Sequence, residues 1–421
     1  MGLFKKKNSN TKEISNIEEI NQTKENNEQE KNVNVSSIQE DRNETIIEEK
    51  NTQETIKENE VEDTVVIGIN GEEERVNFGA LKQYIDDDEI TDVNCNGKQV
   101  WLNHVQKGRY QATDCQFGNQ EILDLAYRIS NIENEQFNST FQVLEADFNG
   151  LRFHFTHPEF TTSGASCSIR KTPVVQRISD DQFSEGYGTE QLLNFLKKLV
   201  KAQLSTVVCG MTGAGKTELC KYLIKFTNNW DRIITIEDTL ELHLPQIYPE
   251  KDVVEMKVNP RIDYELAIKS CLRMLPTWML LSEARGKEIK ELLKSVSTGG
   301  KIITTIHSPK ASDIPNRMLN MFEDNELSND KIENMIYTYI DIGIHVSADY
   351  TENSTFRYID ELVYFDICNG KPRVSHLFKA HRRLNGTVEY EYYPLPHSLI
   401  EKLEEKNIDP EWKSNVERKK G

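Results

Sequence analysis

The sequence predicts an α/β protein: a doubly wound, mostly parallel sheet domain in residues 189–421, a smaller α+β domain before it, and a disordered N-terminal tail. Three observations lead to this prediction. From Thr189 onwards, short apolar strands alternate with amphipathic helices, which is typical of a parallel sheet covered on both faces. Residues 63–171 carry hairpin signals instead. Before Phe78, the only aromatic residue is Phe4.

Residues 1–62 are expected to form a disordered polar and acidic tail. A segment with so few large apolar side chains cannot bury enough surface to offset the conformational entropy lost on ordering. We expect a spacer, with recruitment of a partner as the alternative. The basic start, Lys5-Lys6-Lys7, is followed by no apolar region, so it does not resemble a signal peptide and fits a solvated end better than a membrane contact.

Residues 63–171 are expected to form the α+β domain. The dipeptides Asn96-Gly97 and Asn149-Gly150 are typical of tight turns between antiparallel strands. The expected elements are strands over 64–69, 141–148 and 151–155, two strands within 90–103, and a helix over 120–129.

Residues 172–188 contain Pro173, Gly186 and Gly188 and are expected to form a flexible linker. Thr189 then suits the N-cap of a helix, because its side chain can accept a hydrogen bond from the first turn. Further helices are expected over 216–227, 264–275, 286–296 and 397–406. Strands are expected over 206–210, 232–236, 278–281, 301–306, 342–347, 358–365 and 374–379.

The composition excludes several classes of protein. The net charge of −18 makes bulk binding to nucleic acid unfavourable, and we expect no direct sequence-specific nucleic-acid binding. The seven cysteines are scattered and lack the spacing of a zinc site or a disulfide framework. No apolar run is long enough to cross a membrane. We therefore expect a cytoplasmic protein.

One motif is complete. The segment Gly210-Met211-Thr212-Gly213-Ala214-Gly215-Lys216-Thr217 fits the pattern G-x-x-x-x-G-K-[ST], with an apolar strand before it and an amphipathic helix after it. The glycines let the backbone turn its N–H groups toward phosphate oxygens, and the helix adds its positive end. Lys216 is expected to reach the β and γ phosphates, and Thr217 to bind Mg²⁺. The motif predicts a site for ATP.

Three further apolar strands end in polar residues that chemistry could use: Glu237 and Asp238 in TIEDTLEL, Glu283 in SEARGKE, and His307 in TTIHS. The carboxyl ends of parallel strands are where such sheets place their sites. The alternatives are a solvated helix cap at Asp238 and a structural histidine.

Together these motifs resemble the type II/type IV secretion ATPase superfamily. The segments STGGKIITTIHS, ITDVNCNGKQVWL, GLRFHF and SCSIRK resemble further segments of that family, in the same order. The resemblance implies a RecA-like P-loop domain and a hexameric ATPase that uses ATP and Mg²⁺. It also implies a position at the inner face of the cell membrane, beside secretion or pilus components.

The resemblance also implies roles for individual residues. Lys216 and Thr217 would hold phosphate and Mg²⁺, while Glu237 and Glu283 would position the metal and the attacking water. His307 would sense the γ-phosphate. Two arginines of the N-terminal domain, Arg152 and Arg170, would approach the nucleotide, with plain surface arginines on strands as the alternative.

The sequence departs from the family at three positions. Thr277 stands where an acid is usual, Ser282 replaces a glycine, and Gly300 lies where a first histidine is common. These changes bear on the turnover rate more than on nucleotide binding. The leading interpretation is a motor of the conjugation or tight-adherence branch, since the four-cysteine zinc motif of the type II branch is absent. The alternatives are a regulatory or scaffold subunit with little hydrolysis, and a small-molecule kinase.

Overall fold

A computed structural model of the chain describes residues 64–67, 73–148, 150–259, 261–286, 288–322, 328–350, 355–383 and 387–419. The tail predicted over residues 1–62 lies outside the described residues. Residues 63–421 form one compact unit. Among the residues described, no helix combines the length and the apolar character that a membrane crossing requires.

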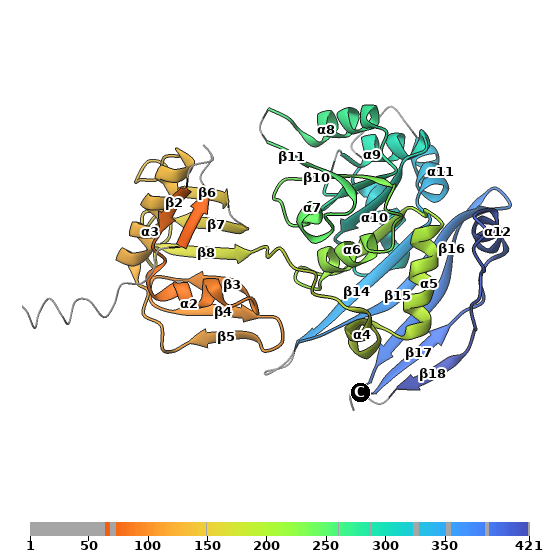
Figure 1. The fold of residues 1–421 in the computed structure, drawn as a ribbon, viewed down its shortest axis with the longest axis horizontal. Coiled ribbons are helices and arrows are strands. Elements are labelled where there is room, and N and C mark those ends of the chain that lie inside the picture. The colour runs from red at the N-terminus through yellow and green to blue at the C-terminus, as the bar shows by residue number, and fades with distance from the viewer. Residues whose placement is uncertain are drawn as a thin grey trace, which may run out of the picture. The chain divides into compact units, whose positions relative to one another are not determined.

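The first sheet has six antiparallel strands in the order β5-β4-β3-β8-β7-β6 (Figure 1). Its turns at Gly97 and Gly150 have φ angles of 82° and 71°, the left-handed region that favours glycine. The strands are β3 (Ile90–Cys95), β4 (Val100–His104), β5 (Gly108–Ala112), β6 (Val143–Phe148), β7 (Leu151–Thr156) and β8 (Ser166–Lys171).

One face of this sheet is covered by α3 (Asn119–Glu133), whose apolar side chains join the buried cluster of the strands. A short hairpin, β1 (Thr64–Ile67) with β2 (Glu73–Val76), precedes it, followed by the 3-10 turn η1 (Gly79–Leu81) and α2 (Lys82–Asp86). The hairpins and the helix predicted for this region are therefore present, and α3 is longer than predicted. The division into domains stays a prediction.

The second sheet has ten strands in the order β11-β10-β12-β13-β9-β14-β15-β16-β17-β18. The first six strands of that order are parallel to one another, and β15 to β18 are antiparallel. The parallel strands are β9 (Thr206–Cys209), β10 (Arg232–Glu237), β11 (Asp252–Lys257), β12 (Trp278–Leu281), β13 (Lys301–Ile306) and β14 (Ile342–Tyr350). The antiparallel strands are β15 (Thr355–Cys368), β16 (Lys371–Arg382), β17 (Val388–Tyr392) and β18 (Val416–Lys419).

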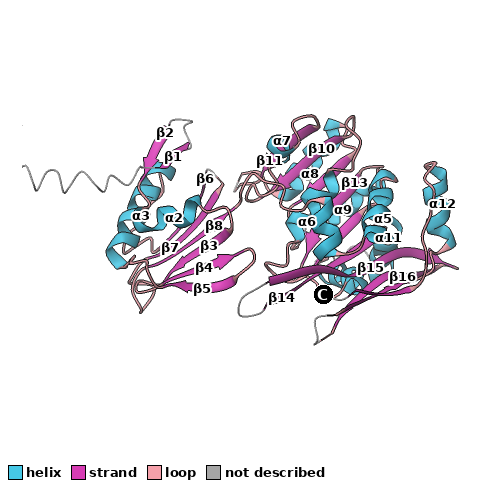
Figure 2. Cartoon of the chain, turned by 60° about the horizontal axis from the view of Figure 1, so that its bottom comes forward, coloured by secondary structure: helices cyan, strands magenta, loops and turns pink. Residues whose placement is uncertain are grey.

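Both faces of the parallel part are buried. Val208 faces the apolar cluster that includes α5 and α6, whereas its neighbour Val207 faces the cluster that includes α8, α9, α10 and α11. Figure 2 shows α5, α6, α8, α9 and α11 beside the magenta strands. The helices are α5 (Glu190–Lys201), α6 (Lys216–Ile224), α7 (Leu244–Ile247), α8 (Tyr264–Cys271), α9 (Glu288–Ser297), α10 (Ile314–Asn320), α11 (Asn329–Tyr339) and α12 (His397–Glu405), with 3-10 turns η3 (Leu272–Met274) and η4 (Ala311–Asp313). The predicted doubly wound fold is confirmed.

The segment predicted to be a flexible linker is partly structured. Its second half forms α4 (Asp180–Gln182) and the π-helical turn η2 (Phe183–Tyr187). The Phe183 ring is fully buried and stacks on Tyr222 of α6, with 5.7 Å between ring centroids. Asp180 accepts hydrogen bonds from Lys197 and Lys225 at 2.7 Å each. Apolar packing and ion pairs therefore attach this half of the segment to the helices around the second sheet.

Candidate nucleotide-binding site

The glycine-rich loop connects β9 to α6, and its backbone adopts φ angles that favour glycine. Gly210, Gly213 and Gly215 have φ angles of 148°, 79° and 96°. A Cβ atom at Gly210 would lie 2.3 Å from the carbonyl oxygen of Val346 on β14, so a larger residue would clash with backbone. In the same loop, Ala214 is buried, whereas Met211 and Thr212 are exposed. The loop thus forms a tight turn above the start of a helix, as the motif predicts.

Lys216 is the first residue of α6, and its side chain folds back over the loop. Its Nζ donates to the carbonyl oxygens of Gly210 and Met211, at 3.2 Å each, and lies 3.4 Å from Nδ1 of His307. Burial lowers the pKa of Lys216, and the nearby Glu283 carboxylate partly offsets that shift. The ammonium group is held where a phosphate could reach it.

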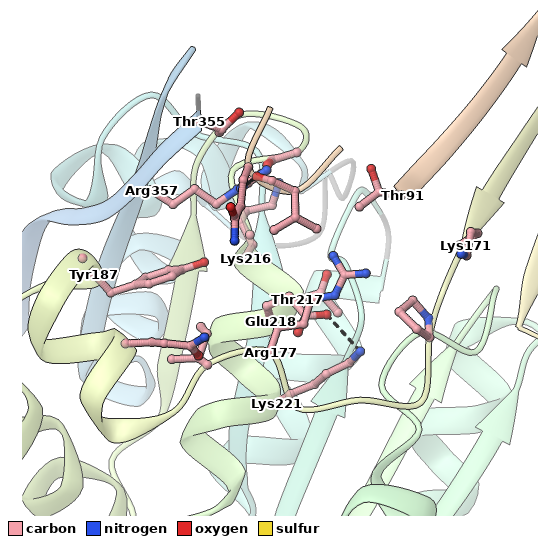
Figure 3. Close-up of a pocket in the computed structure, with 18 of the residues that line it drawn as sticks. Thr91, Lys171, Arg177, Tyr187, Lys216, Thr217, Glu218, Lys221, Thr355 and Arg357 are labelled. Carbon is pink, nitrogen blue, oxygen red and sulfur yellow. Dashed lines mark hydrogen bonds and ion pairs between the residues drawn. The ribbon is translucent and has the colours of Figure 1, made fainter. Parts of the chain in front are cut away.

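A cavity of about 580 Å³ opens beside this loop. It contains six cationic side chains: Arg170, Lys171, Arg177, Lys216, Lys221 and Arg357. Figure 3 shows Lys216, Thr217, Glu218 and Lys221 along the start of α6, with Arg357 and Tyr187 beside the loop. Four acids line the same cavity: Asp92, Glu185, Glu218 and Glu241. The cations therefore exceed the acids by two, and this excess at a helix N-terminus favours an anionic ligand.

Glu237 does not line the cavity. Its side chain is fully buried at the end of β10, and Oε2 accepts hydrogen bonds from the backbone N–H groups of Glu241 and Leu242, at 2.9 and 3.1 Å. Burial raises the pKa of Glu237 to about 7, although the two backbone hydrogen bonds lower it. In this geometry the carboxyl group shapes the loop that follows β10, rather than facing a ligand.

The acid that lies beside the P-loop helix is Glu241, which the sequence analysis did not single out. Its Oε2 accepts a hydrogen bond from the hydroxyl group of Thr217 at 3.4 Å, and it lines the cavity. Burial raises the pKa of Glu241, and the charge of Arg170 acts against that rise. The available signal was its place four residues after Glu237 in the same acidic motif.

Glu283, His307 and Lys216 form a continuous chain of contacts. Nε2 of His307 lies 3.1 Å from Oε1 of Glu283, and its Nδ1 faces Lys216. Arg285 donates to Glu283 at 2.9 Å and to Asp238 at 3.0 Å, and so connects the ends of β12 and β10. The structure therefore brings together three of the predicted site residues. Arg285 is an additional member that sequence reasoning missed.

The two predicted arginines lie on neighbouring strands of the first sheet, where Arg152 pairs with Arg170. Arg170 lines the cavity, and its Nε donates to Asp92 at 2.9 Å. Arg152 does not line the cavity, but its charge, like that of Arg170, acts against the rise that burial causes in the pKa of Glu241. Their placement supports a contribution from the first sheet to the charge of the site.

Two of the three departures from the family pattern, Thr277 and Gly300, have local structural roles. The Thr277 hydroxyl accepts a hydrogen bond from the Arg232 backbone N–H at 3.2 Å, which joins the beginnings of two parallel strands. Ser282 is buried at the end of β12. At Gly300, a Cβ atom would lie 3.1 Å from the end of the Met279 side chain, so little room remains for a larger residue.

The fold and this loop define a P-loop ATPase: a buried parallel strand, a glycine-rich turn, and a helix that starts with Lys216 and Thr217. Residues 149–338 match the family described as "Type II/IV secretion system protein". An uncharacterised protein of Bacillus anthracis is 25% identical over 381 residues, which cover 87% of this chain and 84% of that protein. The "Type IV secretion system protein VirB11" of Brucella suis is 27% identical over 321 residues, 68% of this chain and 88% of that protein.

Among solved structures, the Legionella pneumophila ATPase DotB shares the fold, with a TM-score of 0.51 and 17% identity over 69% of this chain and 80% of that one. The family match over residues 149–338 and the similarity to VirB11 support the type II/type IV secretion ATPase superfamily for this chain. These similarities support an ATP-driven protein of the secretion type, and the resemblance inferred from the motifs is confirmed.

Proposed function

We propose that the cavity beside the P-loop binds ATP with Mg²⁺, and that hydrolysis there drives a type IV secretion, conjugation or pilus-assembly machine. The observation that carries this proposal is the chain of contacts from Lys216 through His307 to Glu283. It joins the phosphate end of a P-loop to an acid at the end of a neighbouring parallel strand.

The residues of the loop fit a bound phosphate group. Lys216 can exchange its loop carbonyl partners for phosphate oxygens, and the N–H groups of a glycine-rich loop are the usual donors to phosphate. The side-chain oxygens of Thr217 and Glu241 lie 3.4 Å apart and could both be ligands of Mg²⁺. Mg²⁺ is often bound by only one or two protein side chains together with substrate phosphates. When bound there, Mg²⁺ would neutralise charge on the phosphates.

Glu283, which Lys216 reaches through His307, would accept a proton from the water that attacks the γ-phosphate. His307 contacts both Glu283 and Lys216, so it would couple a change at the γ-phosphate to the position of the Glu283 carboxylate. Arg285 holds the same carboxylate and would orient it. Glu237 would act one step away, by shaping the loop that carries Glu241.

Substitution of Lys216 tests the proposal. In Lys216→Ala, the charge that faces the transferring phosphate is lost, and ATP hydrolysis should fall about a hundredfold or more. Phosphate release is the measurement, with circular dichroism to show that the fold is kept. Lys294→Ala, in α9 and paired with Glu291, is the matched control and should retain wild-type turnover. A Lys216→Ala protein that keeps most of its activity would contradict the proposed site.

The work of the motor would be done by a ring of chains at the inner face of the cell membrane. Closed symmetric assembly is the common way for identical chains to repeat one interface. The relative in Brucella suis is named a type IV secretion system protein, and the similarity to this chain covers 88% of that relative. This similarity supports the same class of machine for this chain. Membrane-embedded components of that machine would then be the partners.

A further inference from the structure

Arg357, near the start of β15, makes contacts that the roles proposed above do not use. Its Nε donates to the carbonyl oxygen of Gly213 in the P-loop at 3.2 Å, and its Nη1 donates to the carbonyl oxygen of Val105 at 3.0 Å. The aliphatic part of the side chain lies against Gly215, since a Cβ atom there would be 3.4 Å from Cδ of Arg357. One guanidinium group therefore joins two backbone segments far apart in sequence.

The second of these segments is the turn between β4 and β5, residues 105–107. The backbone N–H of Thr355 donates to the carbonyl oxygen of Gln106 in this turn at 2.7 Å. The buried His104 shapes the turn, because its Nδ1 accepts hydrogen bonds from the N–H groups of Gln106 and Lys107, at 3.0 and 3.2 Å. Two adjacent carbonyl groups are thus presented to the beginning of β15.

A guanidinium group is planar and carries its donors in a fixed fork. When Nη1 donates to the carbonyl oxygen of Val105, the direction of the Nε–H group is fixed as well. The Nε–H group in turn holds the carbonyl group of Gly213 in position. That carbonyl belongs to the loop whose N–H groups are proposed to bind phosphate. The position of the β4–β5 turn is therefore transmitted to the P-loop through a single side chain.

We propose that Arg357 is a positioning residue that holds the P-loop in its phosphate-binding form only while the β4–β5 turn lies against β15. This inference rests on the proposed nucleotide site and adds to it a coupling between nucleotide affinity and a turn of the first sheet. Because coupling between two binding events is reciprocal, bound nucleotide should also strengthen the contact between the turn and β15.

The experiment compares binding of a fluorescent ADP analogue to wild type and four variants of the full chain. Arg357→Met keeps the aliphatic stem and removes both hydrogen bonds, so the dissociation constant should rise about tenfold. Arg357→Lys keeps the positive charge but has no planar guanidinium group, and its affinity for the analogue should remain several-fold lower than that of wild type. His104→Ala should weaken binding, and the double variant His104→Ala/Arg357→Met should bind no more weakly than Arg357→Met alone.

Arg383→Met is the matched control, since this arginine of the same sheet region pairs with Glu389 outside the cavity, and it should bind as wild type does. If His104→Ala does not fold, Gly108→Ala replaces it, because Gly108 has a φ angle of 74° and an alanine there strains the same turn. Full affinity in Arg357→Lys, or additive effects in the double variant, would mean a direct charge contact with the ligand and would overturn the proposal.

Amide hydrogen exchange distinguishes the proposed coupling from a purely structural role of Arg357, which would not make exchange in the β4–β5 turn depend on nucleotide. In wild type, nucleotide should slow exchange of peptides that cover residues 104–108, and in Arg357→Met this protection should be lost. Unchanged protection in the variant would overturn the proposal. A wild-type chain that does not bind the analogue at all would instead contradict the proposed nucleotide site, so the two failures are distinguishable.

Discussion

At the scale of single residues, the two acids Glu241 and Glu283 have different neighbours. Glu241 lies beside the hydroxyl group of Thr217, whereas Glu283 contacts His307 and Arg285. A carboxylate beside a hydroxyl group suits a metal with phosphate ligands, and one beside an imidazole suits proton transfer. We therefore propose one role for Glu241 and another for Glu283, whereas the sequence motifs assigned both roles jointly to Glu237 and Glu283.

We predict that Glu283→Gln binds ATP but hydrolyses it about a hundredfold more slowly, since the amide cannot accept the proton of the attacking water. Analysis of bound nucleotide after incubation should find ATP rather than ADP. Glu241→Gln is the comparison variant and should instead raise the Mg²⁺ concentration needed for half-maximal activity. Normal hydrolysis in Glu283→Gln, with ATP trapped in Glu241→Gln, would exchange the two roles.

The raised pKa of Glu237 makes a second prediction at this scale. Burial raises the pKa from 4.5 to about 7, so the folded chain keeps a proton that the unfolded chain has released. Stability from this group is therefore present below pH 4.5 and is lost as the pH rises through 7, by about 3 kcal/mol. Glu237→Gln keeps the acceptor for both loop N–H groups and cannot ionise.

The free energy of unfolding of Glu237→Gln, relative to wild type, should consequently increase between pH 5 and pH 8. Urea unfolding at several pH values measures it. Glu237→Ala, which loses the acceptor, should be less stable than Glu237→Gln throughout that range. Parallel curves for wild type and Glu237→Gln would show that the carboxyl group does not titrate in this window.

At the scale of elements, η2 and α4 show how much of the predicted linker contributes to stability. Phe183 is fully buried and contacts Tyr187 and Tyr222, and the carboxylate of Asp180 is held by two lysines. The ion pair with Lys197, followed by that with Lys225, lowers the pKa of Asp180 well below its usual range. These contacts place Tyr187 next to Gly215 of the P-loop.

We predict that Phe183→Ala lowers the free energy of unfolding by about 3 to 5 kcal/mol, because a large buried ring leaves a cavity. The exposed Phe160→Ala, with 59% of its surface accessible, is the matched control and should change stability by about 0.5 kcal/mol or less. Equilibrium urea unfolding compares the two. Equal stability of both variants would mean that the segment is as loosely attached as its composition suggests.

The elements that sequence reasoning predicted are those with a strong local pattern. The strands β9, β10, β12 and β13 are runs of buried residues, and the hairpin turns carry glycine. Strand β11 was missed because it lies at the sheet edge and contains Asp252, Glu255 and Lys257. The strands β17 and β18 were missed for a related reason, since they are short and rich in charged residues.

The site could be predicted only as far as its strand ends. Lys216 was predicted from the complete P-loop motif, and Glu283 and His307 from their places at the ends of apolar strands. Glu241 was missed, because its place four residues after Glu237 does not reveal that the loop after β10 folds back over the buried carboxyl group of Glu237. Arg357 could not be predicted, since its partners lie about 140 and 250 positions away and no local pattern records such contacts.

At the scale of the whole molecule, charge from the first sheet reaches the cavity beside the P-loop. Arg170 on β8 lines that cavity, together with Thr91 and Asp92 of β3. A ligand that contacts both this arginine and the P-loop would favour arrangements in which the first sheet lies close to the second, because only those arrangements make both contacts. Loss of the γ-phosphate would remove part of the preference for the closed arrangement. The power stroke would then be the return to the open arrangement after hydrolysis.

We therefore predict that Arg170→Ala weakens ATP binding and slows hydrolysis without unfolding the chain. Small-angle scattering of wild type should show compaction with a non-hydrolysable ATP analogue, and the variant should show less. Arg109→Ala is the matched control, because this arginine of β5 donates to Asn103 and lies outside the cavity. Light scattering should give a mass of about six chains, as expected for a closed ring. If Arg170→Ala has unchanged kinetics, and wild type is a monomer that does not compact, the P-loop site would stand and the domain-closure mechanism would not.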